Sequence, residues 1–283
     1  MFYLSDETLD RYIQEDIPYF DLTTWVLGMG DMPGNMEYFT REDAVLCGTE
    51  EVVRILQKMQ IQVDMAWDSG KEIKAGDVFL RARGQAKQLH MAWKVGQNIF
   101  DQCSGIATRT RRMVEKAKSV NPHILIATTR KGFPGTKPLV IKSIAIGGAL
   151  PHRLGLSETV LVFRQHMNFM GGFAGFVSQI PSIKHHICEK KLIVEAQSVE
   201  EGLVLGQSGV DGLQFDKLPA DILQRAVKEL RKINPCLTLI AAGGITMENV
   251  LLYAQSGVDV LVTTSLYHGK PIDMGVKIAP LRS

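Results

Sequence analysis

Cationic side chains concentrate in one stretch of the chain, residues 127–166, on two segments that glycines interrupt in an otherwise apolar region. They are Arg130, Lys131, Lys137, Lys142 and Arg153, with His152 beside the last of them. A hydrophobic core gains nothing from these charges, whereas arginine offers phosphate and carboxylate groups a planar fork of donors. The stretch therefore predicts a site for phosphate, carboxylate or both, built from these residues.

Two acidic residues end consecutive predicted strands. Glu195 lies at the end of the run LIVEA (residues 192–196), and Asp216 at the end of GLQFD (residues 212–216). Carboxylates on adjacent strand ends can share a divalent cation. Each could instead cap a helix or accept backbone hydrogen bonds, but the pair together with the basic stretch favours a functional site.

A glycine pair and a run of hydroxyls follow the last two predicted strands. Gly243 and Gly244 let the backbone approach a ligand closely, and the helix that follows favours an anion at its N-terminus. Thr263, Thr264 and Ser265 end the last strand, where α/β barrels commonly bind a phosphate. Two ordinary tight turns are the alternative.

A further cation, Lys94, lies on a predicted helix over residues 87–102. It shares a helix face with Asn98, because four residues separate the two. A solvated helix face explains this pair as well as a role in a site does.

The bulk composition excludes several classes of protein. The chain has 283 residues, 45% of them hydrophobic and 22% charged, so we expect a packed core. The net charge of +2 argues against a general nucleic-acid binder. No apolar run reaches the ~18 residues of a membrane span and no signal peptide opens the chain, so we expect a cytoplasmic protein. The four cysteines show no metal-ligand spacing and are expected to be free, buried thiols.

The elements that must position these residues alternate between strand and helix after about residue 105. Apolar runs predict strands at residues 124–128, 192–196, 212–216, 237–241 and 258–263. Helices are predicted after Ser198, after Pro219 over residues 220–233, and after Thr246 over residues 247–255. Such alternation is typical of a parallel sheet, and we predict an α/β barrel.

The first hundred residues follow a different pattern. A helix begins after Ser5, a helical pattern covers residues 45–59, and a turn at residues 74–77 leads into a strand at residues 78–81. The long helix over residues 87–102 follows. This mixture predicts a separate α+β domain before the barrel.

A set of short motifs runs in order along the chain. They are Gln14-Glu-Asp16, Asp21-Leu-Thr-Thr24, Ser104-Gly-Ile-Ala-Thr108, Thr129-Arg-Lys131, Pro134-Gly135, residues 147–163 (GGALPHRLGLSETVLVF), Val194-Glu195, Asp216 and Gly243-Gly-Ile245. By these motifs the chain resembles the nicotinate-nucleotide pyrophosphorylases, also called quinolinate phosphoribosyltransferases, over nearly its whole length. Residues 147–163 are most similar to the ModD branch, proteins linked by name to molybdenum-transport operons.

The resemblance implies an α/β fold of two domains, as in the type II phosphoribosyltransferases. They are an N-terminal α/β sandwich over residues 1–104 and an incomplete α/β (TIM-like) barrel over residues 105–269, with residues 270–283 packing back on the sandwich. It also implies a homodimer in which the sandwich completes the partner's active site.

The implied reaction joins a ring nitrogen to C1 of phosphoribosyl pyrophosphate and releases pyrophosphate, with Mg²⁺. Glu195 and Asp216 would hold the ribose hydroxyls and the metal, and Lys131 would act with them. The 5′-phosphate would bind at Gly243, Gly244 and residues 263–265, and the anionic groups at Arg130, Lys131, His152 and Arg153.

The chain departs from the family at several of these positions. The family's Lys-Asp-Asn-His is here Phe163-Arg-Gln-His166, and its Lys-Thr-Thr-Pro-Gly-Leu-Arg is Lys131-Gly-Phe-Pro-Gly-Thr-Lys137. Lys94 aligns with the arginine that the helix offers to the partner's site, and lysine cannot reproduce the bidentate hold of arginine on a carboxylate. Pro151 and Lys217 replace other residues beside the basic loop and after the barrel aspartate.

These departures predict an acceptor less anionic or more aromatic than quinolinate, and they make decarboxylation doubtful. The alternatives are an ordinary quinolinate enzyme of NAD synthesis and a non-catalytic protein that binds a phosphate or an oxyanion in molybdenum uptake. The carboxylates of Glu195 and Asp216 at the predicted site favour an enzyme, because a protein that binds an oxyanion gains nothing from negative charges there.

Overall fold

A computed structural model of the chain describes residues 2–281. It divides into two compact units. The N-terminal unit comprises Met1–Arg111, Phe133–Gly147 and Tyr267–Ser283, and the barrel unit comprises Arg112–Gly132 and Gly148–Leu266.

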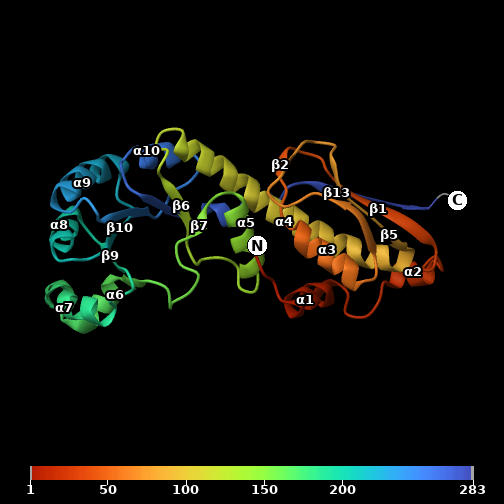
Figure 1. Cartoon of the computed structure of the whole chain (residues 1–283), viewed down its shortest axis with the longest axis horizontal. Coiled ribbons are helices and arrows are strands. Elements are labelled where there is room, and N and C mark those ends of the chain that lie inside the picture. Colours follow the sequence, from red (N-terminus) through yellow and green to blue (C-terminus); the bar gives the residue numbers. More distant parts are fainter. Residues whose placement is uncertain (1, 282–283) are drawn as a thin grey trace. The chain divides into compact units, whose positions relative to one another are not determined.

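The barrel unit contains a seven-stranded parallel sheet in the order β7-β6-β12-β11-β10-β9-β8. Figure 1 shows strands β9 and β10 flanked by helices α8 and α9. Because β7 and β8 stand at opposite ends of this order, the sheet in the described residues is an incomplete barrel. The strands are β6 (Leu125–Thr128), β7 (Leu150–Pro151), β8 (Val160–Val162), β9 (Leu192–Ala196), β10 (Gly212–Asp216), β11 (Thr238–Ala242) and β12 (Val260–Thr263).

Helices and short turns connect the strands. They are α6 (Arg164–Met167), η1 (Asn168–Met170), α7 (Gly172–His186), α8 (Val199–Gln207), α9 (Ala220–Ile233), α10 (Val250–Ala254) and η2 (Ser265–Tyr267). The predicted cap of α8 is confirmed, since the Ser198 side chain accepts a hydrogen bond from the Glu201 amide. The predicted start of α10 is wrong: the helix begins at Val250, because the Asn249 side chain accepts the Thr246 amide in a preceding turn.

The N-terminal unit is built on a four-stranded antiparallel sheet in the order β13-β1-β5-β3. These strands are β13 (Met274–Pro280), β1 (Pro33–Thr40), β5 (Val78–Gln85) and β3 (Gln62–Ala66), and β2 (Ala44–Val45) pairs with β4 (Glu72–Ile73). Its helices are α1 (Asp6–Asp16), α2 (Leu22–Val26), α3 (Thr49–Lys58), the first part of α4 (Ala86–Lys118), and α5 (Lys137–Ile146). Residues 282 and 283 of the predicted C-terminal segment lie outside the described residues. The predicted α/β fold class, a sandwich with an incomplete barrel, is confirmed.

Two helix predictions in this unit were wrong in their extent. The helical pattern over residues 45–59 begins at Val45, the last residue of strand β2, and the helix starts only at Thr49, after Gly48 in the left-handed region at φ +100°. Helix α4 does not end near residue 102 but continues to Lys118, because its apolar face remains buried at Ala107 and Val114.

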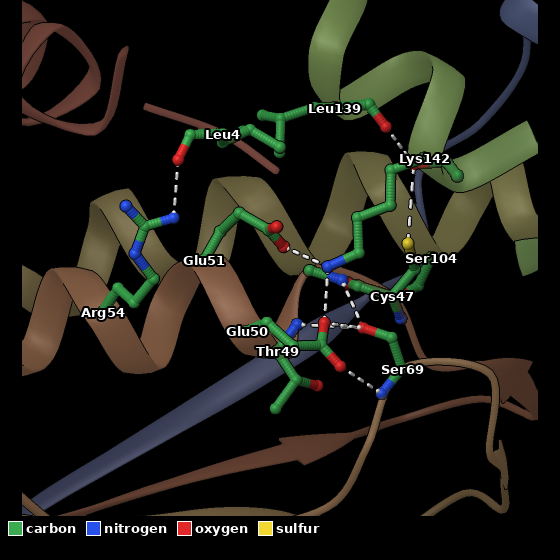
Figure 2. Close-up of polar contacts among 12 residues, drawn as sticks. Leu4, Cys47, Thr49, Glu50, Glu51, Arg54, Ser69, Ser104, Leu139 and Lys142 are labelled. Atoms are coloured by element: carbon green, nitrogen blue, oxygen red, sulfur yellow. Dashed lines mark hydrogen bonds and ion pairs between the residues drawn. The ribbon is translucent and has the colours of Figure 1, made fainter. Parts of the chain in front are cut away.

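Lys142 was also wrongly assigned to the anion site. Its side chain is 4% exposed, and its Nζ forms ion pairs with Glu50 and Glu51 inside the N-terminal unit, as Figure 2 shows. Burial alone would lower the pKa of Lys142, but the hydrogen bonds to the two carboxylates outweigh it and the pKa is raised. The ammonium therefore fastens α5 to the start of α3.

The cysteines are free, as predicted, but only Cys47 and Cys103 are buried, whereas Cys188 and Cys236 are exposed. No helix within residues 2–281 is both long and apolar enough to span a bilayer.

Candidate active site

A pocket of about 520 Å³ lies at the carboxyl ends of the barrel strands. Its lining comes entirely from the barrel unit. The predicted residues that line it are Arg130, Lys131, His152, Arg153, Phe163, Glu195, Asp216, Gly243, Gly244, Thr263, Thr264 and Ser265. The parallel sheet brings these residues together, because the strands that precede them all end at one edge.

Glu195 and Asp216 lie on neighbouring strands at the pocket. Glu195 is half-buried on β9, and Asp216 is exposed at the end of β10. Burial, and then the negative charge of Asp216, raise the pKa of Glu195 against an opposing hydrogen bond from Gln214. A cation beside the two carboxylates would stabilise the charged form of Glu195.

The glycine loop packs directly against Asp216. Gly243 and Gly244 have φ of +81° and +70°, a region that side chains other than glycine rarely adopt. A Cβ on Gly243 would overlap Asp216 Oδ1, whereas a Cβ on Gly244 would meet no atom within 4 Å. The first glycine thus makes room for the carboxylate, and the second leaves open space for a ligand.

The hydroxyl residues after β12 are held in a local network. Thr263 is buried and its Oγ1 donates to the Ile245 carbonyl oxygen at 2.6 Å, while the Ser265 amide donates to Thr263 Oγ1 at 3.0 Å. Thr264 Oγ1 lies 2.8 Å from Thr129 Oγ1. Thr263 therefore shapes the loop after β12. This loop and the glycine loop after β11 together present backbone to the pocket.

Four basic side chains face the pocket from the loops after β6 and β7. Arg130 and Lys131 follow β6, and the half-buried His152 and buried Arg153 follow β7. Burial and then the Arg153 charge lower the pKa of His152, so its ring is neutral near pH 7, and its Nε2 is buried without a hydrogen-bond partner among the described residues. Burial and then the Arg130 charge lower the pKa of Arg153. An anion would relieve this crowding of positive charge.

Phe163 supplies an apolar surface at the same pocket, next to Leu161. Its ring stacks on that of His166 with centroids 5.8 Å apart and planes at 25°. The Phe163 amide donates to His166 Nδ1 at 2.9 Å, which fixes the residue at the start of α6.

Two predicted site residues do not line this pocket. Lys94 lies on α4 and Lys137 begins α5, both in the N-terminal unit. Lys94 Nζ donates to Gln97 Oε1 at 3.2 Å and lies 4.7 Å from the centre of the Trp93 ring.

Four further polar residues line the pocket that the sequence analysis did not assign to the site: Thr129, Gln214, Lys217 and Thr246. Lys217 has φ +59°, a strained conformation for a lysine, and its amide donates to the Ala242 carbonyl oxygen at 2.8 Å. Gln214 could have been found, because a carboxamide inside a buried strand needs a polar partner. Nothing in the sequence pattern indicates Thr246.

Models of one protein family match both parts of the chain. The C-terminal domain of quinolinate phosphoribosyl transferase matches residues 106–277, and the N-terminal domain matches residues 21–104. A protein assigned the name pyrophosphorylase ModD from Rhodobacter capsulatus is 38% identical over 259 residues, covering 91% of this chain and 98% of its own. Another from Pasteurella multocida is 32% identical over 278 residues, covering 98% and 99%.

Solved structures share the fold. NadC from Streptococcus pyogenes superposes with a TM-score of 0.89 at 22% identity, covering 100% of both chains. The nicotinate-nucleotide pyrophosphorylase from Francisella tularensis gives 0.88 at 22% identity and covers 98% of both. The two domain matches together span most of the chain, and relatives named ModD are 32% and 38% identical to it, so the chain belongs to the quinolinate phosphoribosyl transferase family.

Proposed function

We propose that this phosphoribosyltransferase moves the phosphoribosyl group of phosphoribosyl pyrophosphate to a ring nitrogen of an aromatic acceptor other than quinolinate. One observation carries the proposal: Glu195 and Asp216 end neighbouring strands in a pocket that also holds Arg130, Lys131 and Arg153. A sugar diphosphate carries both kinds of group that this arrangement complements, a diol and a polyanion.

The charges follow the bonds that change. The lone pair of the ring nitrogen attacks C1 as the bond from C1 to the pyrophosphate oxygen breaks, and the electron pair of that bond leaves with pyrophosphate. Positive charge therefore grows on the sugar, near Glu195 and Asp216, which also accept hydrogen bonds from the ribose hydroxyls. Lys131 and Arg130 stabilise the negative charge that grows on pyrophosphate, so no side-chain nucleophile is needed.

The 5′-phosphate binds at the loops that follow β11 and β12. Gly243 and Gly244 turn the backbone toward it, and Thr264 and Ser265 lie on the second loop with Thr263 as its support. Such loops are a common phosphate site of α/β barrels.

Mg²⁺ fits this donor set. Within residues 2–281 no group of three or more His, Cys, Asp or Glu side chains could hold a metal. Mg²⁺ nevertheless keeps several waters and binds through one or two carboxylates together with substrate oxygens, which Glu195 and Asp216 could provide. When bound, it would neutralise charge on the departing pyrophosphate.

The acceptor half of the pocket supports a ring with less negative charge than a dicarboxylate. Phe163 offers a phenyl face where the family has a lysine, and the neutral His152 offers a hydrogen-bonding nitrogen rather than a charge. The remaining cations Arg130, Lys131 and Arg153 favour the second candidate, quinolinate itself.

The proposal includes a homodimer in the cytoplasm. Lys94 would then serve the partner's site from the N-terminal unit. Lys94 supports this role because it is exposed on α4.

Thermal denaturation tests the proposal against a binding protein for oxyanions. We expect phosphoribosyl pyrophosphate with Mg²⁺ to raise the melting temperature, and molybdate alone to leave it unchanged, because only a bound ligand stabilises the folded state. Asp216→Ala should abolish the shift. The reverse pattern would refute the transferase.

A further inference from the structure

Gln214 is a buried carboxamide at the active site. It is 6% exposed on β10, between the apolar residues Leu213 and Phe215, which are 0% and 2% exposed. A polar group in such a strand costs free energy unless it is hydrogen-bonded. Packing alone would favour an apolar side chain here, so the amide calls for another explanation.

The partner of this amide is Glu195. Gln214 occupies the register position of Glu195 on the neighbouring parallel strand, so both side chains leave the sheet on the same face. Its Nε2 donates to Glu195 Oε2 at 2.8 Å, a hydrogen bond to a carboxylate. The same carboxylate receives a second amide, from the exposed Gln197, whose Nε2 lies 3.5 Å from Oε1.

We propose that Gln214 is a positioning residue that holds Glu195 in the orientation required to bind the ribose of phosphoribosyl pyrophosphate, an inference that rests on the proposed function. By engaging Oε2, it leaves Oε1, which has only the long 3.5 Å contact with the exposed Gln197, as the oxygen that a ribose hydroxyl meets. The negative charge of Asp216 repels Glu195, and the buried amide opposes this repulsion with a fixed donor. Gln214 thus acts through Glu195 and not on the reacting atoms.

Two glutamines on one carboxylate provide a matched pair of variants. Gln214→Met keeps the length of the side chain and removes the donor at 2.8 Å, while Gln197→Met removes the exposed one at 3.5 Å. Calorimetry would measure the Kd of phosphoribosyl pyrophosphate with Mg²⁺ for each. We expect Gln214→Met to raise Kd roughly ten-fold, the loss of a hydrogen bond to a charged group, and Gln197→Met to leave it within about two-fold.

A double-mutant cycle separates this role from a structural one. If Gln214 acts through Glu195, then adding Gln214→Met to Glu195→Ala raises Kd no further, so the two effects are strongly non-additive. Additive effects, or equal Kd values for wild type and Gln214→Met, would overturn the inference. If the wild type itself does not bind the sugar diphosphate, both the proposed function and this role fail. If the wild type binds it but the two substitutions act additively, only the role of Gln214 fails.

Discussion

Gly243 and Asp216 are packed so closely that no side chain fits between the glycine Cα and the carboxylate, since a Cβ would overlap Oδ1. Gly243 also requires the left-handed conformation, at φ +81°. The loop that would bind phosphate and the carboxylate that would bind ribose therefore depend on each other.

Gly243→Ala should disturb both at once. We expect it to cost about 2 kcal/mol of stability from backbone strain and displacement of Asp216, and to lower kcat/KM at least about ten-fold. Gly244→Ala is the control, because it adds strain at φ +70° but meets no atom within 4 Å. Urea unfolding and initial rates would check both. Equal losses in the two variants would show that the contact with Asp216 has no special role.

Phe163 should select acceptors with little negative charge over dicarboxylates such as quinolinate. Phe163→Lys restores the cation that the family places here, so we expect kcat/KM for quinolinate to rise about ten-fold, the gain of one charge-assisted hydrogen bond. Phe163→Leu removes the ring without adding a charge and should not give this gain. Steady-state rates with quinolinate would check the prediction, and equal rates in the two variants would contradict it.

Lys142 should be the most important ion-pairing residue for stability in the N-terminal unit. Lys142→Met leaves the carboxylate of Glu51, 2% exposed, without its cation, which should cost about 3–5 kcal/mol. The exposed pair of Lys74 and Asp43, 72% and 57% exposed, provides the comparison, since Lys74→Met should cost under about 1 kcal/mol. Urea denaturation of the two variants would measure the difference. Similar midpoints would mean that the buried ion pair contributes little.

Asp101 should make stability depend on pH. Burial raises the pKa of Asp101 to about 6 from its ordinary value of 3.8, against the opposing hydrogen bond from the Met274 amide. Between these pH values the folded state holds more protons than the unfolded state, so this carboxyl's contribution to stability falls as pH rises from about 4 to about 6. The side chain in Asp101→Asn cannot ionise. The melting temperature of this variant, relative to that of the wild type, should therefore rise between about pH 4 and pH 6, and the difference should stay constant above that range. A difference that does not vary with pH would refute this.

Much of the site could be predicted because the ends of strands can be recognised in the sequence. Glu195 and Asp216 end short apolar runs, and parallel strands all end at one edge, so their meeting follows from the alternation of strand and helix. The turn at Gly243 and Gly244 can be predicted in the same way, since a glycine pair after a strand indicates a turn.

Other features depend on contacts between distant parts of the chain. Lys142 looked like a site cation, because its partners Glu50 and Glu51 lie about ninety residues away and no periodicity links them. Gln214 looked like a strand residue, since only the register of β9 and β10 reveals Glu195 beside it. Helix α4 was predicted too short, although Gly105 lies within it and suits its interior, because a Cβ there would come 3.1 Å from Pro271 Cα, a residue far away in the sequence.

The most direct test is release of pyrophosphate from phosphoribosyl pyrophosphate and Mg²⁺ with a panel of pyridine, benzimidazole and pterin-like acceptors that includes quinolinate. The account predicts turnover with an aromatic acceptor other than quinolinate, abolished by Glu195→Ala and by Asp216→Ala. Turnover with quinolinate at the highest rate of the panel would contradict the altered acceptor, and release that survives both substitutions would contradict the site itself.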